Sequence, residues 1–218
     1  PSCPSTRRSE KRKSPMKSGK NKEWLPEEGE KVLLHACCAP CSSAIVEYLV
    51  GKGIRPTIFY SNSNITPEKE YRRRLSECVR YAGHWGLEIV EDTYDHRDWK
   101  CISRSLEKEP ERGKRCLECF RYRLTRAAEY ASKNGFRHLS TTLASSRWKD
   151  LSQVDEAGKW ACSLFPGVTW WDRNWRKGGL QERRNELIRE FGFYNQQFCG
   201  CEFSPRGEDQ RTSNDEAE

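Results

Sequence analysis

Residues 35–41, His-Ala-Cys-Cys-Ala-Pro-Cys, place three thiols within one short stretch of the chain. The apolar run at residues 31–34, directly before it, predicts a short buried strand. Residues 41–50 then carry apolar side chains at helical spacing, and Gly51 and Gly53 indicate where that helix ends. The three cysteines therefore occupy a strand-to-helix turn, and open α/β folds gather their ligand sites at such turns.

Cys37, Cys38 and Cys41 are suited to chemistry at this position. A helix N-terminus lowers the pKa of a nearby thiol and so favours the thiolate, the form that binds metals and attacks electrophiles. Packing is the alternative, because a free cysteine also behaves as a small hydrophobic residue. Three thiols at one turn favour a metal or redox site over packing.

Predicted strands alternate with predicted helices along most of the chain. Strands are predicted at residues 31–34, 56–60, 87–90 and 136–143. Helices are predicted at residues 41–50, at 67–85 with Thr66 as the cap, in a polar stretch through Trp99, and at 114–133 and 181–191. In the second helix Tyr71, Leu75, Cys78 and Val79 are predicted on one face, and the arginines at 72–74 are expected to be solvated. The alternation predicts an α/β fold, a Rossmann-like parallel sheet flanked by helices, with a helical C-terminal part.

Cys116 and Cys119 begin the predicted helix at residues 114–133. Residues three apart share one face of a helix, so the two thiols can bind one metal ion or cluster. Together with Cys37 and Cys38 they offer four thiolates, which suits both tetrahedral zinc and an iron–sulfur cluster. Zinc usually draws on two Cys-x-x-Cys pairs, so the adjacent pair at 37 and 38 leans mildly towards iron–sulfur.

Cys199 and Cys201 form a third group of thiols, separated by Gly200 near the C-terminus. A disulfide between them closes a very small ring, which glycine permits at some strain, and strained disulfides are easily reduced. The spacing therefore predicts a redox pair, and a further set of metal ligands is the alternative.

Basic and aromatic residues in two stretches predict contacts with RNA. Residues 145–149, Ser-Ser-Arg-Trp-Lys, follow a predicted strand, where Arg147 and Lys149 suit phosphate binding and a capping turn is the alternative. Residues 170–179 interleave aromatic and basic side chains, which suits stacking on unpaired bases beside phosphate contacts. The contacts predicted there are Trp171, Arg173, Arg176 and Lys177. Core tryptophans beside a solvated turn would produce the same pattern.

The composition indicates one domain with two tails. The 218 residues fit a domain at 23–204, between a basic tail at 1–22 and an acidic tail at 205–218, both expected to be disordered. The basic tail alone carries a charge of +7, equal to that of the whole chain, so the net charge says little about nucleic-acid binding. Met16 is the sole methionine, and we expect the natural start there.

The cysteine content indicates a reducing compartment. Eleven cysteines, an odd number, follow an N-terminus without an apolar signal segment. No apolar run approaches the length of a membrane span. We therefore expect a cytoplasmic protein with no membrane partner, in which clustered cysteines serve metal or redox chemistry.

Four motifs, taken together and in order, resemble the cobalamin-independent epoxyqueuosine reductases of the QueH family. They are His-x-Cys-Cys-Ala-Pro-Cys at 35–41, Arg-Cys-x-x-Cys-Phe-x-x-Arg-Leu at 115–124, Ser-Thr-Thr-Leu-x-x-Ser at 140–146 and Gln-x-Phe-Cys-Gly-Cys at 196–201. The resemblance covers residues 31–204. The Cys-x-x-Cys alone is unspecific, whereas the ordered set is specific.

The resemblance implies an activity and its cofactor. The family carries out the last step of queuosine synthesis, the reduction of epoxyqueuosine to queuosine at the wobble position of the tRNA anticodon. The resemblance makes residues 23–204 an iron–sulfur catalytic domain with a [4Fe–4S] cluster. The implied cluster ligands are Cys37, Cys38, Cys116 and Cys119, and the implied redox-active pair is Cys199 and Cys201.

A second iron with cysteine and aspartate ligands is also associated with the family. Cys41 lies where it can reach such an iron, and the aspartate is not located by the sequence. The implied partners are tRNA that contains epoxyqueuosine and an unidentified electron donor. The chain departs from its relatives at residues 170–177, where Asp172 or Lys177 can align with the family's Asp-Phe-Arg/Lys-Lys.

The implied reaction suits these residues. Removal of an epoxide oxygen to leave an alkene needs two electrons, protons and an electrophile, which iron and a thiol pair can supply. Two hypotheses from other classes stay open at this point. One is a zinc-stabilised RNA-binding module without catalysis, and the other is a thiol oxidoreductase that acts on proteins.

Overall fold

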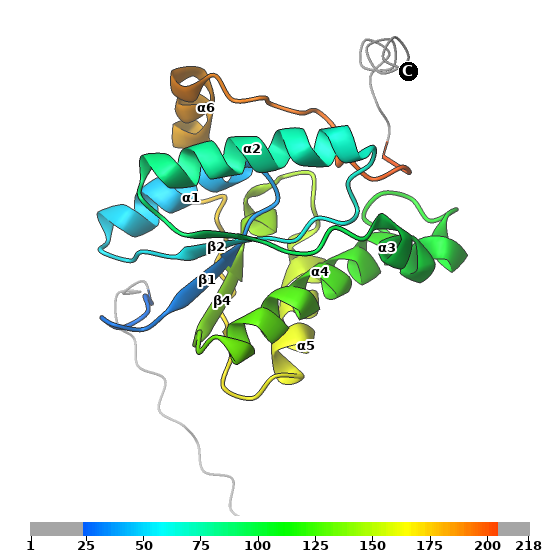
Figure 1. The fold of residues 1–218 in the computed structure, drawn as a ribbon, viewed down its shortest axis with the longest axis horizontal. Helices are drawn as coiled ribbons and strands as arrows, with labels where there is room; N and C mark the ends of the chain where they lie inside the picture. Colours follow the sequence, from blue (N-terminus) through cyan, green and yellow to red (C-terminus); the bar gives the residue numbers. More distant parts are fainter. Residues whose placement is uncertain (1–23, 205–218) are drawn as a thin grey trace, which may run out of the picture.

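The computed structural model describes residues 24–204, and the tails predicted at 1–22 and 205–218 lie outside the described residues. The described chain forms a five-stranded sheet in the order β3-β2-β1-β4-β5, and every pairing is parallel. Helices cover both faces of this sheet (Figure 1). The predicted α/β fold with a parallel sheet flanked by helices is confirmed.

The strands are short and mostly buried. They are β1 Val32–His35, β2 Thr57–Tyr60, β3 Ile89–Glu91, β4 His138–Thr141 and β5 Thr169–Trp170. All four residues of β1 are buried, because β1 is the central strand and has helices on both faces. A strand that is buried on both faces needs apolar side chains on both, which explains why β1 appears in the sequence as a continuous apolar run.

Six α-helices within residues 24–204 surround the sheet. They are α1 Ala39–Gly51, α2 Glu68–His84, α3 His96–Ser103, α4 Lys114–Lys133, α5 Leu151–Ser163 and α6 Leu180–Phe191. Helices α1, α2 and α6 lie on one side of the sheet, and α4 and α5 lie on the other (Figure 1). None of the helices in residues 24–204 is long and apolar enough to cross a membrane.

His35 ties three strand ends together at the base of the site. Its Nε2 donates to the carbonyl oxygen of Ser61 at 3.1 Å, and its Nδ1 accepts from the hydroxyl of Thr141 at 2.7 Å. Burial, helped by the charge of Arg123, lowers the pKa of His35 to about 3, so the ring is neutral at neutral pH. The ends of β1, β2 and β4 are therefore held in fixed register under the loops that follow them.

Helix α2 differs from its prediction at its start and on its face. Pro67 occupies the N-cap position and the helix begins at Glu68, so the predicted cap at Thr66 lies one residue too early. Val79 is 47% exposed, and Ala82 is buried instead. The expected solvated run of arginines is also wrong at Arg74, which is only 3% exposed.

Helix α5 and strand β5 were not expected from the sequence. The Asp150 carboxylate caps α5, because it accepts the backbone N–H groups of Ser152 and Gln153. Val154 and Ala161 are buried at helical spacing on its inner face. The cap and the spacing are signals by which the helix is recognisable, although its apolar residues are small.

Candidate active site

A cavity of about 450 Å³ lies where the loops after β1, β2 and β4 meet. Four thiols line it, and they are Cys37, Cys38, Cys41 and Cys199. Its walls also include the first turn of α6 and the segment that follows α6. The cavity therefore stands at the carboxyl ends of the central strands, where parallel sheets bind their ligands.

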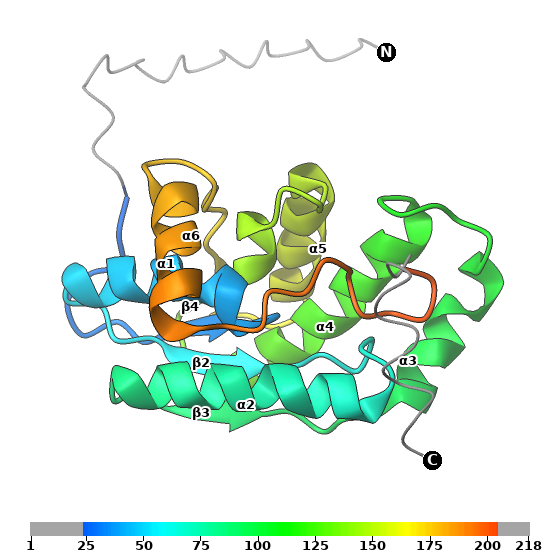
Figure 2. The ribbon, with the colours of Figure 1, turned by 90° about the horizontal axis from the view of Figure 1, so that it is seen from above.

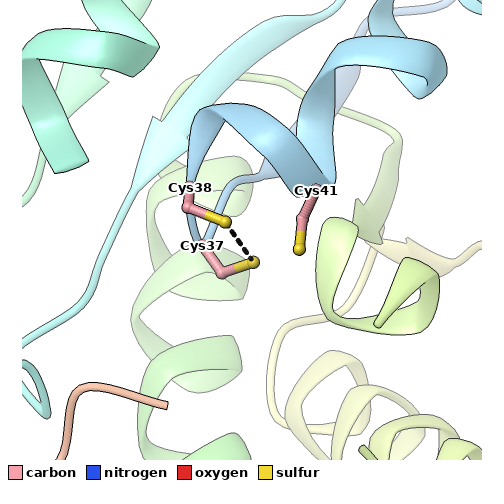
Figure 3. A group of neighbouring side chains, drawn as sticks. All are labelled: Cys37, Cys38 and Cys41. Carbon is pink, nitrogen blue, oxygen red and sulfur yellow. Dashed lines mark hydrogen bonds between the residues drawn. The ribbon is translucent and has the colours of Figure 1, made fainter. Parts of the chain in front are cut away.

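Cys37, Cys38 and Cys41 point towards one another at the start of α1 (Figure 3). Their sulfur atoms all lie within 4.8 Å of one another, and the sulfurs of Cys37 and Cys38 are 3.8 Å apart. Within residues 24–204 this is the one group of three or more His, Cys, Asp or Glu side chains whose ligand atoms lie close enough together to hold a metal ion. Pro40 in the first turn of α1 helps to fix the helix start between them.

Cys37 has the electrostatic character of a thiolate. Hydrogen bonds from Cys38 and Cys41 hold the pKa of Cys37 below its ordinary value in spite of burial. The hydroxyl of Thr142 also donates to Cys37 Sγ at 3.3 Å. The hydrogen bond with Cys37 raises the pKa of Cys38 and of Cys41, so Cys37 is the thiol of the three that ionises most readily.

Cys116 and Cys119 lie on the first turns of α4, outside the lining of this cavity. Cys119 is buried beside Trp99 and Cys201, and burial raises the pKa of both α4 thiols. The ligand set implied by the sequence is therefore not one compact group in the structure. Cys41 is the thiol that accompanies Cys37 and Cys38, while Cys119 accompanies the C-terminal pair.

Cys199 and Cys201 lie on the segment that crosses from α6 towards α3 and α4, drawn orange to red in Figure 2. Both thiols are free. A hydrogen bond from Cys201 and the charge of Lys149 hold the pKa of Cys199 below its ordinary value. Cys199 therefore has the character of a thiolate that faces the cavity, with the Cys201 thiol behind it.

Arg74 of α2 fixes this segment in place. Its guanidinium donates to the carbonyl oxygen of Cys199 at 2.9 Å, lies 4.9 Å from the ring centre of Phe198 and pairs with Glu70 at 2.6 Å. Gly200 has a φ of +100°, and a Cβ there would lie 3.1 Å from the guanidinium. The glycine between the two cysteines is thus required both for its backbone conformation and for the close approach of Arg74.

Arg123 of α4 places a buried positive charge among the thiols. It donates to the carbonyl oxygen of Ser61 at 3.1 Å and is 2% exposed. Its charge lowers the pKa of Cys37, of Cys119 and of Cys199, although other groups outweigh it at Cys119. The charge of Arg123 therefore favours the ionised forms of Cys37 and Cys199 in particular.

The stretch at 145–149 reaches the cavity, as its predicted role requires. Arg147 and Lys149 both line it, but Lys149 hydrogen-bonds to Cys199 and lies at the thiols. Trp148 between them is 62% exposed and also lines the cavity. Trp148 is a candidate base-stacking residue that was missed, and its place between two basic residues is the signal that points to it.

In the stretch at 170–179, several side chains that were predicted to contact RNA instead pack in the core or bond to the backbone. Trp171 is 5% exposed and packs edge-on against Trp175 at 5.3 Å, so it is a core side chain rather than a stacking surface. Arg176 donates to the carbonyl oxygens of Ser146 and Lys149 at 2.6 and 2.7 Å, and so shapes the loop at the cavity. Arg173 lies over the rings of Tyr48 and Trp175, and Lys177 is exposed.

A cavity lined by free thiols, at the carboxyl ends of a parallel sheet, makes this an α/β protein with a candidate metal or redox centre. The family model described as Epoxyqueuosine reductase QueH matches residues 32–207. The protein of that name from Histophilus somni is 43% identical over 182 residues, which are 84% of this chain and 75% of the relative. The chain belongs to the epoxyqueuosine reductase QueH family.

Other relatives with the same name agree. The protein from Acinetobacter baylyi is 43% identical over 182 residues, which are 84% of each chain. The protein from Thermotoga maritima is 33% identical over 176 residues, which are 79% of this chain and 89% of the relative. As a member of this family the chain is an oxidoreductase of queuosine biosynthesis, which reduces epoxyqueuosine to queuosine.

Proposed function

We propose that the chain carries out this reduction at the wobble position of the tRNA anticodon, in the cytoplasm, with a [4Fe–4S] cluster bound by its thiols. The observation that carries the proposal is that Cys37, Cys38, Cys41 and Cys199 all line the same cavity. A flipped-out nucleoside can enter a cavity of about 450 Å³ at the strand ends.

The donor set fits an iron–sulfur cluster. Of the ten described cysteines, all free, Cys37, Cys38, Cys41 and Cys199 line the cavity, and Cys119 and Cys201 pack with Cys199. Thiolates are the ligands that iron–sulfur clusters use. Cys37 and Cys38 on one wall and Cys116 and Cys119 on α4 would hold the cluster. A bound [4Fe–4S] cluster supplies single electrons, and an iron with an open position supplies a Lewis acid for the epoxide oxygen.

Cys41 is the residue that we assign to a mononuclear iron beside the cluster. Its sulfur lies within 4.8 Å of Cys37 and Cys38, which supports a ligand shared with that region. The carboxylate that lines the cavity within residues 24–204 is Glu111, and no aspartate lines it there. Glu111 is therefore our candidate for the carboxylate ligand of such an iron.

Cys199 and Cys201 suit the supply of electrons and protons. Conversion of an epoxide to an alkene breaks two C–O bonds, forms a C=C bond and releases water, for which it consumes two electrons and two protons. Oxidation of two thiols to one disulfide releases two electrons and two protons. The hydrogen bond from Cys201, with the charges of Lys149 and Arg123, favours the thiolate of Cys199. This thiolate is the group from which the oxidation to a disulfide would begin. An external electron donor then restores the pair.

The tRNA would approach from the open side of the cavity. Arg147 is exposed at the cavity. Lys177 is also exposed, and it directly follows Arg176, which bonds to the cavity loop at Ser146. Both side chains can therefore contact phosphate groups. Trp148 offers a ring on which an unpaired base can stack.

The experiment is anaerobic reconstitution followed by mass analysis of the nucleosides of epoxyqueuosine-containing tRNA. Wild-type protein with a reductant should convert epoxyqueuosine to queuosine. The variants Cys199→Ser and Cys201→Ser should lose turnover and keep the visible absorption of the cluster. The matched control is Cys101→Ser, an exposed thiol outside the cavity lining, which should keep full turnover. A fully reconstituted wild-type protein that leaves epoxyqueuosine unchanged contradicts the proposal.

A further inference from the structure

The loop that follows β2 is buried, polar and almost completely hydrogen-bonded. Ser61 Oγ donates to Asp92 at 2.7 Å, and Asn62 Nδ2 donates to the carbonyl oxygen of Ala36 at 2.9 Å. Ser63 Oγ accepts the backbone N–H of Asp95 at 3.0 Å. These contacts fix the backbone of the loop beside the cysteine turn.

Asn64 is the exception in this loop. It is 1% exposed, its Oδ1 is sealed from solvent without a partner, and its amide has no hydrogen bond within residues 24–204. It also lines the thiol cavity. An amide that is buried without a partner lowers stability, and folded proteins leave few such groups. A fixed loop that keeps one amide unpaired at a cavity is the arrangement expected of a ligand contact.

The segment after α6 carries a second group of the same kind. Gln196 lies on the segment before Cys199, it lines the cavity, and its Oε1 is likewise sealed without a partner. An amide offers a donor and an acceptor on one planar group, and can therefore pair with a hydroxyl, an amine or an ether oxygen. Two amide oxygens without partners, from two segments that line one cavity, suit a small polar ring bound there.

We propose that Asn64 is a substrate-binding residue that hydrogen-bonds to the oxygen-bearing, epoxide-containing ring of the modified nucleoside, with Gln196 as a second contact. This inference rests on the proposed function, because the reacting ring has to reach the thiols. Asn64 shares the cavity with Cys37 and Cys38, so a ring at these thiols lies within reach of its amide. Bases and phosphates of the tRNA lie further out, at Arg147 and Trp148.

The thermal stability of variants shows whether Asn64 serves as a ligand contact or as a structural residue. Asn64→Leu removes an unpaired polar group at similar volume, so the metal-loaded protein without tRNA should unfold at the same temperature as wild type or higher. Asn62→Leu is the matched control, because Asn62 has the same 1% exposure in the same loop but a bonded amide. It should unfold at a lower temperature. An equal loss of stability in both variants overturns the inference.

Binding and turnover provide the second test. The probes are epoxyqueuosine-containing tRNA and the same tRNA with unmodified guanosine, each in an anisotropy titration. Wild type should prefer the modified tRNA, and Asn64→Leu and the smaller Asn64→Ser should lose that preference without losing affinity for the unmodified tRNA. The kcat/KM of both variants should fall about 10- to 100-fold, as expected when one hydrogen bond to the substrate is removed, at unchanged iron content.

Different results would contradict the role of Asn64 and the proposed function. If wild type reduces epoxyqueuosine and the Asn64 variants keep both the preference and the kcat/KM of wild type, the inference about Asn64 is wrong and the proposed function stands. If wild type neither prefers nor reduces the modified tRNA, the proposed function is wrong as well.

Discussion

Arg74 and Gly200 show how single residues position the thiols of Cys199 and Cys201. The guanidinium reaches the Cys199 carbonyl oxygen only because no side chain stands at position 200. The chain can hold Cys199 at the cavity and Cys201 behind it because Gly200 adopts a φ of +100°. Sequence alone suggests that this glycine permits a small disulfide ring, whereas its contact with an arginine 126 positions earlier in the chain depends on the fold.

We predict that Gly200→Ala lowers the free energy of unfolding and abolishes turnover. The positive φ costs about 1–2 kcal/mol for an L-residue, and the Cβ contact with Arg74 adds about 1–3 kcal/mol. Gly53→Ala is the matched control, because Gly53 also has a positive φ, +78°, but open space around it. Denaturant unfolding should show the smaller loss for Gly53→Ala, which should keep its activity. Equal losses would mean that the contact with Arg74 contributes nothing.

The secondary-structure elements differ in how well the sequence predicts them. The unit from β1 to α1 is predicted closely, because an apolar run, a proline at the helix start and two glycines mark its parts. Helix α4 is predicted with its observed ends, since Cys116 follows its start and Gly135 follows its end. Helix α5 was missed because its buried face consists of small residues, among them Gly158, which give a weak apolar pattern.

The packing of α5 gives a prediction at this scale. A Cβ added at Gly158 would collide with the ring of Trp170 in β5, so Gly158→Ala should lower the free energy of unfolding by about 1–3 kcal/mol. Gly83→Ala in α2 is the control, since nothing lies within 4 Å of its added Cβ. It should raise stability by about 0.5–1 kcal/mol, because alanine reduces the entropy of the unfolded chain. A stabilising Gly158→Ala would contradict the tight packing of α5 on β5.

The whole molecule decides which cysteines and tryptophans meet. Spacing identifies the pairs on one helix or turn, but it contains no distance between α1, α4 and the segment after α6. For this reason the proximity of Cys119 to Cys201 could not be predicted, whereas that of Cys41 to Cys37 follows from their place on one turn. Trp148 and Trp171 both stand among basic residues, and only the tertiary structure makes the first exposed and the second a core residue.

The same global arrangement predicts where tRNA binds. Replacing Arg147 and Lys177 by Gln should weaken tRNA binding and reduce the slope of log K against log salt by roughly 0.7 to 0.9 for each phosphate group that is no longer neutralised. The control replaces Lys52, which follows α1, and Lys133, at the end of α4 away from its cysteines. That pair removes the same charge and should leave the slope unchanged. Equal slopes in both double variants would place the tRNA on another face.

The central claim is that the thiols hold an iron–sulfur cluster at the cavity, and metal and sulfide analysis of protein purified without oxygen tests it most directly. The account predicts a brown protein with about four iron and four sulfide per chain, and one further iron if the Cys41 site is filled. Cys37→Ala, Cys38→Ala, Cys116→Ala and Cys119→Ala should each lose the cluster and its colour, and Cys101→Ser should keep both. A colourless protein with stoichiometric zinc and no sulfide would contradict the account.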